Sequence, residues 1–225
     1  MNESNAPKSE NFFELLSRWL QSLPTDIKIL IEMIGDDALS AGARSLAVGT
    51  VVYLTARIDL IPDDLPILGH IDDIIILHIA VATIIQIDPQ RGMYYREKYP
   101  QFEALNQQIE LLAKTLGALY GFLKALVENL VKRRFRGQTT ENVVCSEKLQ
   151  EEVFDAAMQY AAGVNVDPET IQHALLAAPP DRIIKLLSDG LEQEAKRQEK
   201  ENPAGGMPKE LPGSIRKLLG RGEQG

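Results

Sequence analysis

Five aspartates lie within fifteen residues, between two strongly apolar stretches of the chain: Asp59, Asp63, Asp64, Asp72 and Asp73. Hard cations such as Mg²⁺ and Ca²⁺ prefer oxygen ligands of this kind. A metal site would require the carboxylates of Asp59, Asp63 and Asp72 to converge across the turn between the two stretches. A metal-dependent enzyme that uses this cluster is the most distant of the functions that the sequence allows.

The same aspartates also have explanations that involve no ligand. Asp72 stands where it could cap the second apolar helix, with Asp73 at the positive end of that helix. Asp59 follows the end of the first helix, where a negative charge is unfavourable. We expect Asp59 to accept hydrogen bonds from downstream amides or to pair with Arg57 or Arg44. The cluster is therefore predicted to be structural, and the protein is predicted to use no cofactor.

No other arrangement of residues is typical of a catalytic centre. His70 and His78 are eight residues apart, which is not the i, i+4 spacing that puts two metal ligands on one helix face. His78 stands in an apolar run, where a neutral buried histidine is expected. The only cysteine, Cys145, is interpreted as an inert thiol. Without a phosphate loop or a nucleophile elbow, the sequence predicts a protein that is not an enzyme.

Composition narrows the class of protein further. A formal net charge of −8 argues against a nucleic-acid partner, because surfaces that bind nucleic acids are basic. Hydrophobic residues make up 44% of the chain, which is enough for a sizeable core. The single cysteine and a polar N-terminus without the pattern of an export signal predict an intracellular protein.

Apolar residues recur with a helical period almost throughout, so the sequence predicts an all-α fold. One helix is expected to end at Pro24, and Thr25 is expected to cap the next. An apolar helical hairpin is predicted over about residues 43–87. No uninterrupted apolar stretch reaches the roughly 20 residues of a membrane span.

The longest predicted helix covers about residues 101–135. Its apolar residues are spaced alternately three and four apart from Phe102 to Leu130, which is typical of a coiled-coil seam or a long bundle helix. The seam either lies across the core of its own chain or joins two copies in a dimer. The helix ends in four cations that complement its dipole or contact an anionic surface: Lys132, Arg133, Arg134 and Arg136.

These elements divide the chain into a helical domain at 12–136, a linker at 137–145 and a small three-helix region at 146–199. The two ends, 1–11 and 200–225, are predicted to be disordered. The predicted fold is therefore a helical bundle built around an apolar hairpin, one long heptad-patterned helix and a small C-terminal helical bundle.

Local signals support the C-terminal helices. Ser146 is expected to cap one helix, and Asp167 is expected to cap another, with Pro168 in the first helical position. The tail contains a short basic amphipathic segment, of a type that docks on membranes or in partner grooves. Its apolar positions are Ile215, Leu218 and Leu219, and its basic positions are Arg216, Lys217 and Arg221.

Three short stretches in the turn of the hairpin form a motif: Ile58-Asp59-Leu60-Ile61-Pro62-Asp63, Pro66-Ile67-Leu68-Gly69 and Ile71-Asp72-Asp73. This motif resembles that of the YkvA-like family, a bacterial domain of unknown function that also occurs in a membrane-bound eukaryotic ubiquitin ligase. The resemblance implies a helical hairpin, often predicted to lie in membranes, with no established catalytic activity. The motif positions in this chain are Asp59, Pro62, Asp63, Pro66, Gly69, Asp72 and Asp73.

Two functions follow from these patterns. The first is a non-enzymatic, membrane-associated adaptor on the cytoplasmic side, whose hairpin inserts or lies shallowly in the bilayer. Its basic residues at 132–136 would meet anionic lipid, and its C-terminal helices would bind a protein partner. The alternative is a soluble cytoplasmic scaffold in which the hairpin is the core and the long helix dimerises.

Overall fold

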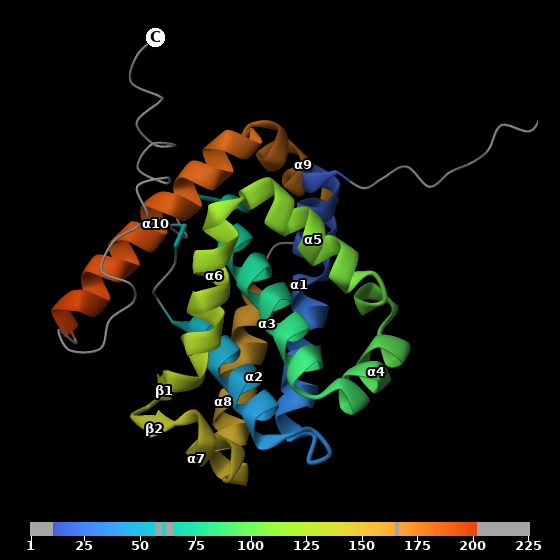
Figure 1. Ribbon diagram of the computed structural model, residues 1–225, viewed down its shortest axis with the longest axis vertical. Helices are drawn as coiled ribbons and strands as arrows, with labels where there is room; N and C mark the ends of the chain where they lie inside the picture. Colours follow the sequence, from blue (N-terminus) through green and yellow to red (C-terminus); the bar gives the residue numbers. More distant parts are fainter. Residues whose placement is uncertain (1–10, 57–59, 62–64, 165–166, 202–225) are drawn as a thin grey trace, which may run out of the picture.

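Nearly all the regions whose apolar residues recur with a helical period form helices in the structure. The computed structural model describes residues 11–56, 60–61, 65–164 and 167–201, and in these ranges it contains ten α-helices and one two-stranded hairpin (Figure 1). The α-helices are α1 (Phe12–Gly35), α2 (Ala41–Thr55), α3 (Ile71–Ile87), α4 (Pro89–Lys98), α5 (Leu105–Leu116), α6 (Ala118–Asn129), α7 (Thr140–Val144), α8 (Glu147–Gly163), α9 (Pro168–Leu176) and α10 (Pro180–Glu201). Short connecting elements are the 3₁₀ turns η1 (Leu68–His70), η2 (Pro100–Phe102) and η3 (Leu130–Lys132) and the strands β1 (Arg134–Phe135) and β2 (Gln138–Thr139).

Helix α1 is continuous, whereas the sequence predicted an end at Pro24 and a cap at Thr25. A proline inside a helix removes one backbone hydrogen bond and costs about 3 kcal/mol or more. The buried stripe of α1 continues across the proline, with Leu23 and Ile27 both 0% exposed. Burying such side chains stabilises the fold by about 1.5–3 kcal/mol each, which outweighs the cost of the proline.

The apolar hairpin predicted at about 43–87 forms the centre of the molecule. Helices α2 and α3 pack against each other and run antiparallel, and α1, α6 and α8 pack around them (Figure 1). Every residue of α3 from Ile71 to Ala82 is buried. A Cβ atom at Gly49 of α2 would lie 2.3 Å from the carbonyl oxygen of Leu130, so only glycine fits at this approach.

One helical stretch, Leu68–Ile87, is long and apolar enough to cross a membrane by length and composition alone. A helix that is apolar on all sides is either a membrane span or the core helix of a folded protein. In this structure 89% of the apolar stretch is buried by the rest of the chain. The helices around the hairpin therefore provide its apolar surroundings.

The long helix predicted at 101–135 consists of two helices that meet at an angle (Figure 1). Gly117 adopts φ 57° and ψ −128°, which residues with a side chain rarely do, and it ends α5 one residue before α6 begins. The predicted apolar stripe nevertheless continues across the break and lies in the core of its own chain. Its buried members are Phe102, Leu105, Leu112, Leu116, Leu119, Leu123, Leu126 and Leu130. The heptad spacing therefore corresponds to an intrachain seam, the first of the two arrangements that the sequence left open.

The segment predicted as a linker at 137–145 is structured. Strands β1 and β2 pair antiparallel, and Arg136 and Gly137 between them both have positive φ. Helix α7 follows directly, capped by Thr139. Two residues per strand are too few to show the alternation by which strands are recognised. The segment predicted as a linker therefore contains a strand and a short helix.

The three helices expected at 146–199 are α8, α9 and α10, and the caps at Ser146 and Asp167 are confirmed. Helix α8 packs along α1 and α2, and α9 packs against α1. The C-terminal helices α8 and α9 therefore pack against the same bundle that contains the hairpin. Of the two ends predicted to be disordered, 1–11 and 200–225, residues 1–10 and 202–225 lie outside the described residues, whereas Asn11 caps α1 and residues 200–201 belong to α10.

Candidate functional site

The motif residues that the structure describes lie between the end of α2 and the start of α3. Pro66 and Gly69 belong to the turn before α3, and Asp72 and Asp73 belong to the first turn of α3. Asp72 is not the cap that the sequence predicted, because the cap position is His70. The remaining candidates lie outside the described residues: Asp59, Pro62, Asp63, Asp64 and Arg57.

Asp72 anchors the chain that leaves α2. Its side chain is fully buried, and its Oδ2 accepts hydrogen bonds from the Tyr53 hydroxyl at 3.0 Å, from the Leu60 amide at 2.7 Å and, weakly, from the Ile61 amide at 3.5 Å. Hydrogen bonds to a charged acceptor are roughly twice as strong as bonds between neutral groups. One carboxylate therefore ties the end of α2 and the segment after it to the start of α3.

Asp73 makes a comparable connection to the C-terminal part of the chain. Its carboxylate is buried, accepts a short hydrogen bond from the Tyr160 hydroxyl of α8 and lies 3.3 Å from Nδ1 of His70. The same His70 nitrogen lies 3.2 Å from the Tyr160 hydroxyl, and the two rings meet edge to face. The three side chains join the start of α3 to α8.

Helix α10 covers the same turn from another side. A Cβ atom at Gly190 would lie 1.9 Å from the carbonyl oxygen of Leu60, so the two backbones are in direct contact. Of the three candidate metal ligands, Asp72 is the one that the structure describes, and its Oδ2 is already occupied by hydrogen-bond donors. Within the described ranges, no three His, Cys, Asp or Glu side chains are placed to share a metal ion. The described hydrogen bonds of Asp72 and Asp73 hold the two ends of the turn and helix α8 together.

A polar cluster in the core was not predicted from the sequence. The indole ring of Trp19 stacks on the ring of His78, with centroids 3.9 Å apart, and its Nε1 donates to Oε1 of Gln108 at 3.0 Å. Asp26 is fully buried and accepts from the Ser22 hydroxyl at 2.5 Å. The sequence feature that could have indicated this cluster is the seven-residue spacing between Trp19 and Asp26, which places both side chains on one face of a helix. It was missed because a helix end was predicted between them.

Burial determines the charge of this cluster. It raises the pKa of Asp26 to about 6, although the hydrogen bonds from Ser22 and Gln101 oppose the change. It lowers the pKa of His78 to about 3, so this histidine is neutral, as the sequence predicted. Nδ1 of His78 donates to the Ile74 carbonyl at 2.8 Å, which leaves Nε2 as an acceptor, 3.6 Å from Oδ2 of Asp26. That distance is too long for a hydrogen bond, so the pair is closely packed without sharing a proton.

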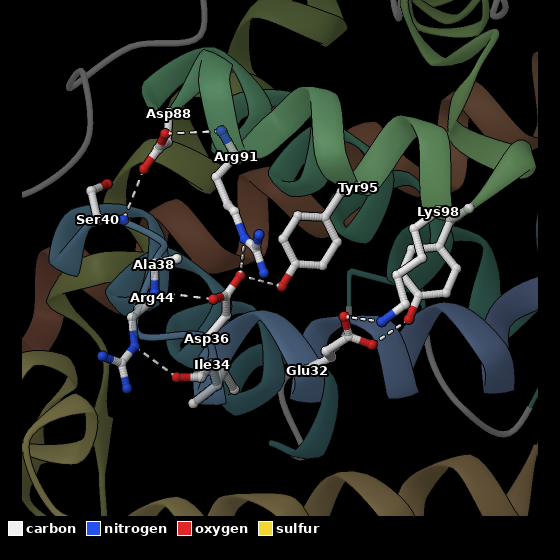
Figure 2. Close-up of polar contacts among 11 residues, drawn as sticks. Glu32, Ile34, Asp36, Ala38, Ser40, Arg44, Asp88, Arg91, Tyr95 and Lys98 are labelled. Atoms are coloured by element: carbon white, nitrogen blue, oxygen red, sulfur yellow. Dashed lines mark hydrogen bonds and ion pairs between the residues drawn. The ribbon is translucent and has the colours of Figure 1, made fainter.

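A second network joins the end of α1 to α4, a helix that the sequence analysis missed (Figure 2). Asp36 accepts from Nε of Arg91 at 2.5 Å and from the Tyr95 hydroxyl at 2.9 Å. Asp88 caps α4 and also accepts from the Ser40 amide at 2.9 Å. The signal for α4 was Asp88 followed by a proline, the same Asp-Pro start that correctly predicted α9.

The second half of this network lies one turn earlier on α1. Glu32 accepts from Nζ of Lys98 at 2.6 Å and a short hydrogen bond from the Tyr99 hydroxyl (Figure 2). Burial by itself raises the pKa of Asp36, but its bonds from Arg91 and Tyr95 outweigh burial and lower the pKa below the ordinary value. Asp36 is therefore a stabilising anion, in contrast to Asp26.

Two of the four cations that were predicted to contact an anionic surface form ion pairs within the protein. Arg133 forms an ion pair with Glu194 of α10 at 3.1 Å, and Arg136 forms one with Glu152 of α8 at 2.6 Å. The exposed cations Lys132 and Arg134 donate to the neutral oxygens of Asn129 and Gly137. Instead of ending one long helix, the cluster lies on η3 and the β hairpin.

Comparison with known proteins gives one result that agrees with the motif. Residues 43–79 match the sequence model of a family described as "Protein of unknown function (DUF1232)", and the predicted resemblance to the YkvA-like family is confirmed over this range. The matched segment covers α2, the turn and the first half of α3. No curated protein and no solved structure matches the chain. The chain is therefore a mostly helical protein that carries this domain as its central hairpin.

Proposed function

We propose that the protein is a non-enzymatic adaptor inside the cell, in which the hairpin is an internal scaffold and the outer helices make the contacts with partners. The observation that carries the proposal is the burial of the hairpin. The matched segment lies in α2 and α3, and α3 has no face in contact with water between Ile71 and Ala82. Residues in this position determine the shape of the molecule and do not reach a partner.

The polar groups of the hairpin also favour this arrangement over insertion into a bilayer. Asp72, Asp73 and His78 lie on α3 and find their hydrogen-bond partners within the protein. Moving α3 into lipid would separate Asp72 from the Leu60 amide and would remove the helices that bury its apolar side chains. Ionisable groups in the bilayer centre cost about 2.5–3.5 kcal/mol or more each.

Fractionation of the native protein tests this proposal. Membranes of the source cell are extracted in parallel with high salt, alkaline carbonate and detergent, with a known membrane-spanning protein as the control. We expect the protein in the supernatant after salt or carbonate, without detergent. Retention in the carbonate pellet with the spanning control, and release by detergent, would show that the hairpin is inserted and would refute the scaffold.

A peripheral contact with anionic lipid is a second candidate, favoured by the exposure of Lys132 and Arg134. Each cation near an anionic surface contributes about 1 kcal/mol, which salt screens. We expect Lys132→Gln/Arg134→Gln to weaken binding to vesicles that contain phosphatidylserine. The matched control is Lys148→Gln/Lys185→Gln, which removes the same charge from exposed positions elsewhere. Equal binding by both variants would exclude this patch as the contact.

A further inference from the structure

An apolar groove lies between the first turns of α1 and the ends of α9 and α10 that face them. Its volume is about 910 Å³. The lining includes apolar side chains from all three helices and from the loop between α9 and α10: Phe12, Phe13, Leu175, Leu176, Pro179 and Pro180. Leu176 is 75% exposed, the largest value among the exposed large hydrophobic residues of the described ranges.

Exposed apolar surface of this shape is typical of a binding groove for another segment. A buried leucine stabilises a protein by about 1.5–3 kcal/mol relative to an exposed one. Covering Leu176 and Phe13 therefore stabilises any arrangement that places an apolar helix face over them. With a volume of about 910 Å³, the groove is large enough to accept several side chains.

The charges around the groove favour a basic occupant. Glu14 lies in the lining, and Glu169 and Asp181 are exposed at the starts of α9 and α10. Arg18 also belongs to the lining, on the next turn of α1. Arg182, next to Asp181, donates to the Ala177 carbonyl at 3.2 Å, so the acidic side chains outnumber the basic ones at this end of the molecule by one.

The chain itself contains a segment with matching chemistry. In the segment 214–221, the apolar residues Ile215, Leu218 and Leu219 have i, i+3, i+4 spacing, which places them on one face of a helix. Arg216, Lys217 and Arg221 occupy the other positions and give the segment a positive charge. This segment lies beyond the described residues.

The length of the tail permits the contact. Helix α10 begins beside the groove at Pro180 and has 22 residues, so it carries the chain about 33 Å away. The twelve residues at 202–213 span up to about 40 Å when extended, which is enough to return along α10. We propose that the segment 214–221 docks as an amphipathic helix in this groove of its own chain and thereby covers Leu176. The contact is a property of the chain alone and does not depend on the adaptor function.

Disulfide trapping in the full-length chain tests the contact. In a Cys145→Ser background, Leu176→Cys is combined with Leu218→Cys, and mild oxidation is followed by non-reducing electrophoresis and mass determination. The matched control combines Leu218→Cys with Met158→Cys, a position on α8 that is 44% exposed and outside the groove. An effective concentration in the millimolar range predicts a monomeric, cross-linked product whose yield does not change on dilution to about 1 μM.

The alternatives give different products. A cross-linked dimer whose yield falls on dilution would mean that the groove binds a second copy, and equal trapping with Met158→Cys would mean random collision. Either result overturns the proposal.

As a second measurement, Ile215→Glu/Leu218→Glu/Leu219→Glu should shift the methyl NMR signals of Leu176. The control Gly213→Glu/Ser214→Glu/Gly220→Glu adds the same charge on other positions and should leave them in place. Identical spectra for the two variants would also refute the docking.

Discussion

Asp26→Asn should stabilise the protein at neutral pH, although it alters a fully buried and hydrogen-bonded side chain. The pKa of Asp26 is raised to about 6 from an ordinary value of 3.8, because burial penalises the charged form. At 1.36 kcal/mol for each unit of difference, the charged carboxylate at pH 7 carries a penalty of about 3 kcal/mol. An asparagine in the same place has no charge to bury.

The neutral amide also suits the neighbouring side chains. Oδ1 of Asp26 accepts from Gln101, while Oδ2 lies near the Ser22 hydroxyl and Nε2 of His78. An amide nitrogen in the place of Oδ2 can donate to the Ser22 hydroxyl, and the amide oxygen keeps the bond from Gln101. Allowing for imperfect geometry, we expect a gain of about 1–3 kcal/mol at pH 7.5.

The dependence on pH provides the decisive check. A carboxyl group with a raised pKa in the fold stabilises the fold while protonated, and this contribution is lost as pH rises from about 4 to about 6. The advantage of Asp26→Asn should therefore be large at pH 7.5 and close to zero at pH 3.5. Urea denaturation followed by circular dichroism measures the difference at each pH, and the contribution of His78 cancels because both proteins contain it.

Asp36→Asn is the matched control with the opposite sign. The pKa of Asp36 is lowered, so its carboxylate stabilises the fold above its ordinary pKa and loses this effect as pH falls. Its replacement should destabilise the protein at pH 7.5 and have less effect in acid. If Asp26→Asn destabilises at pH 7.5, or if its effect is the same at all pH values, burial of a charge at Asp26 is refuted.

Three further substitutions, each compared with a second variant, test the hairpin and the helix break. Asp72→Ala should lower the free energy of unfolding by about 2–4 kcal/mol, because it leaves buried amides unpaired, whereas Tyr53→Phe should lower it by about 1 kcal/mol. Equal stability of Asp72→Ala and the wild type would refute the anchoring role of Asp72. Gly117→Ala should cost about 1–3 kcal/mol at φ 57°, whereas Gly121→Ala inside α6 should stabilise by up to about 1 kcal/mol in the same denaturation assay. Gly49→Ala should cost about 1–3 kcal/mol or prevent folding, whereas Gly42→Ala on the same helix meets no atom within 4 Å and should change the melting temperature little.

Much of the fold could be predicted because helix signals are local. The caps at Ser146 and Asp167 were confirmed, and α3 ends at Ile87, which is the predicted end of the apolar hairpin. The buried, neutral state of His78 followed from its apolar neighbours. In each case the residues that decide the outcome lie within a few positions of one another.

The errors arose where distant contacts decide the local structure. Pro24 lies inside α1 because the core accepts apolar side chains on both sides of it. The leucine stripe of α5 and α6 has the spacing of one helix, yet Gly117 turns the chain while keeping both halves on the core. The donors that occupy Asp72 come from residues 12 and 19 positions earlier in the chain, and no local pattern indicates which donors these are.

The enclosure of α3 also has a consequence during synthesis. Helix α3 is complete at Ile87, but the helices that cover it include α5 and α6, the last of which ends at Asn129. At about 5–20 residues per second, a ribosome needs about 2–8 s to add these 42 residues. For that interval the nascent chain carries a helix that is apolar on all sides and not yet enclosed. A nascent chain with α1 to α3 in place therefore still exposes the apolar side of α3 that α5 and α6 cover in the complete protein.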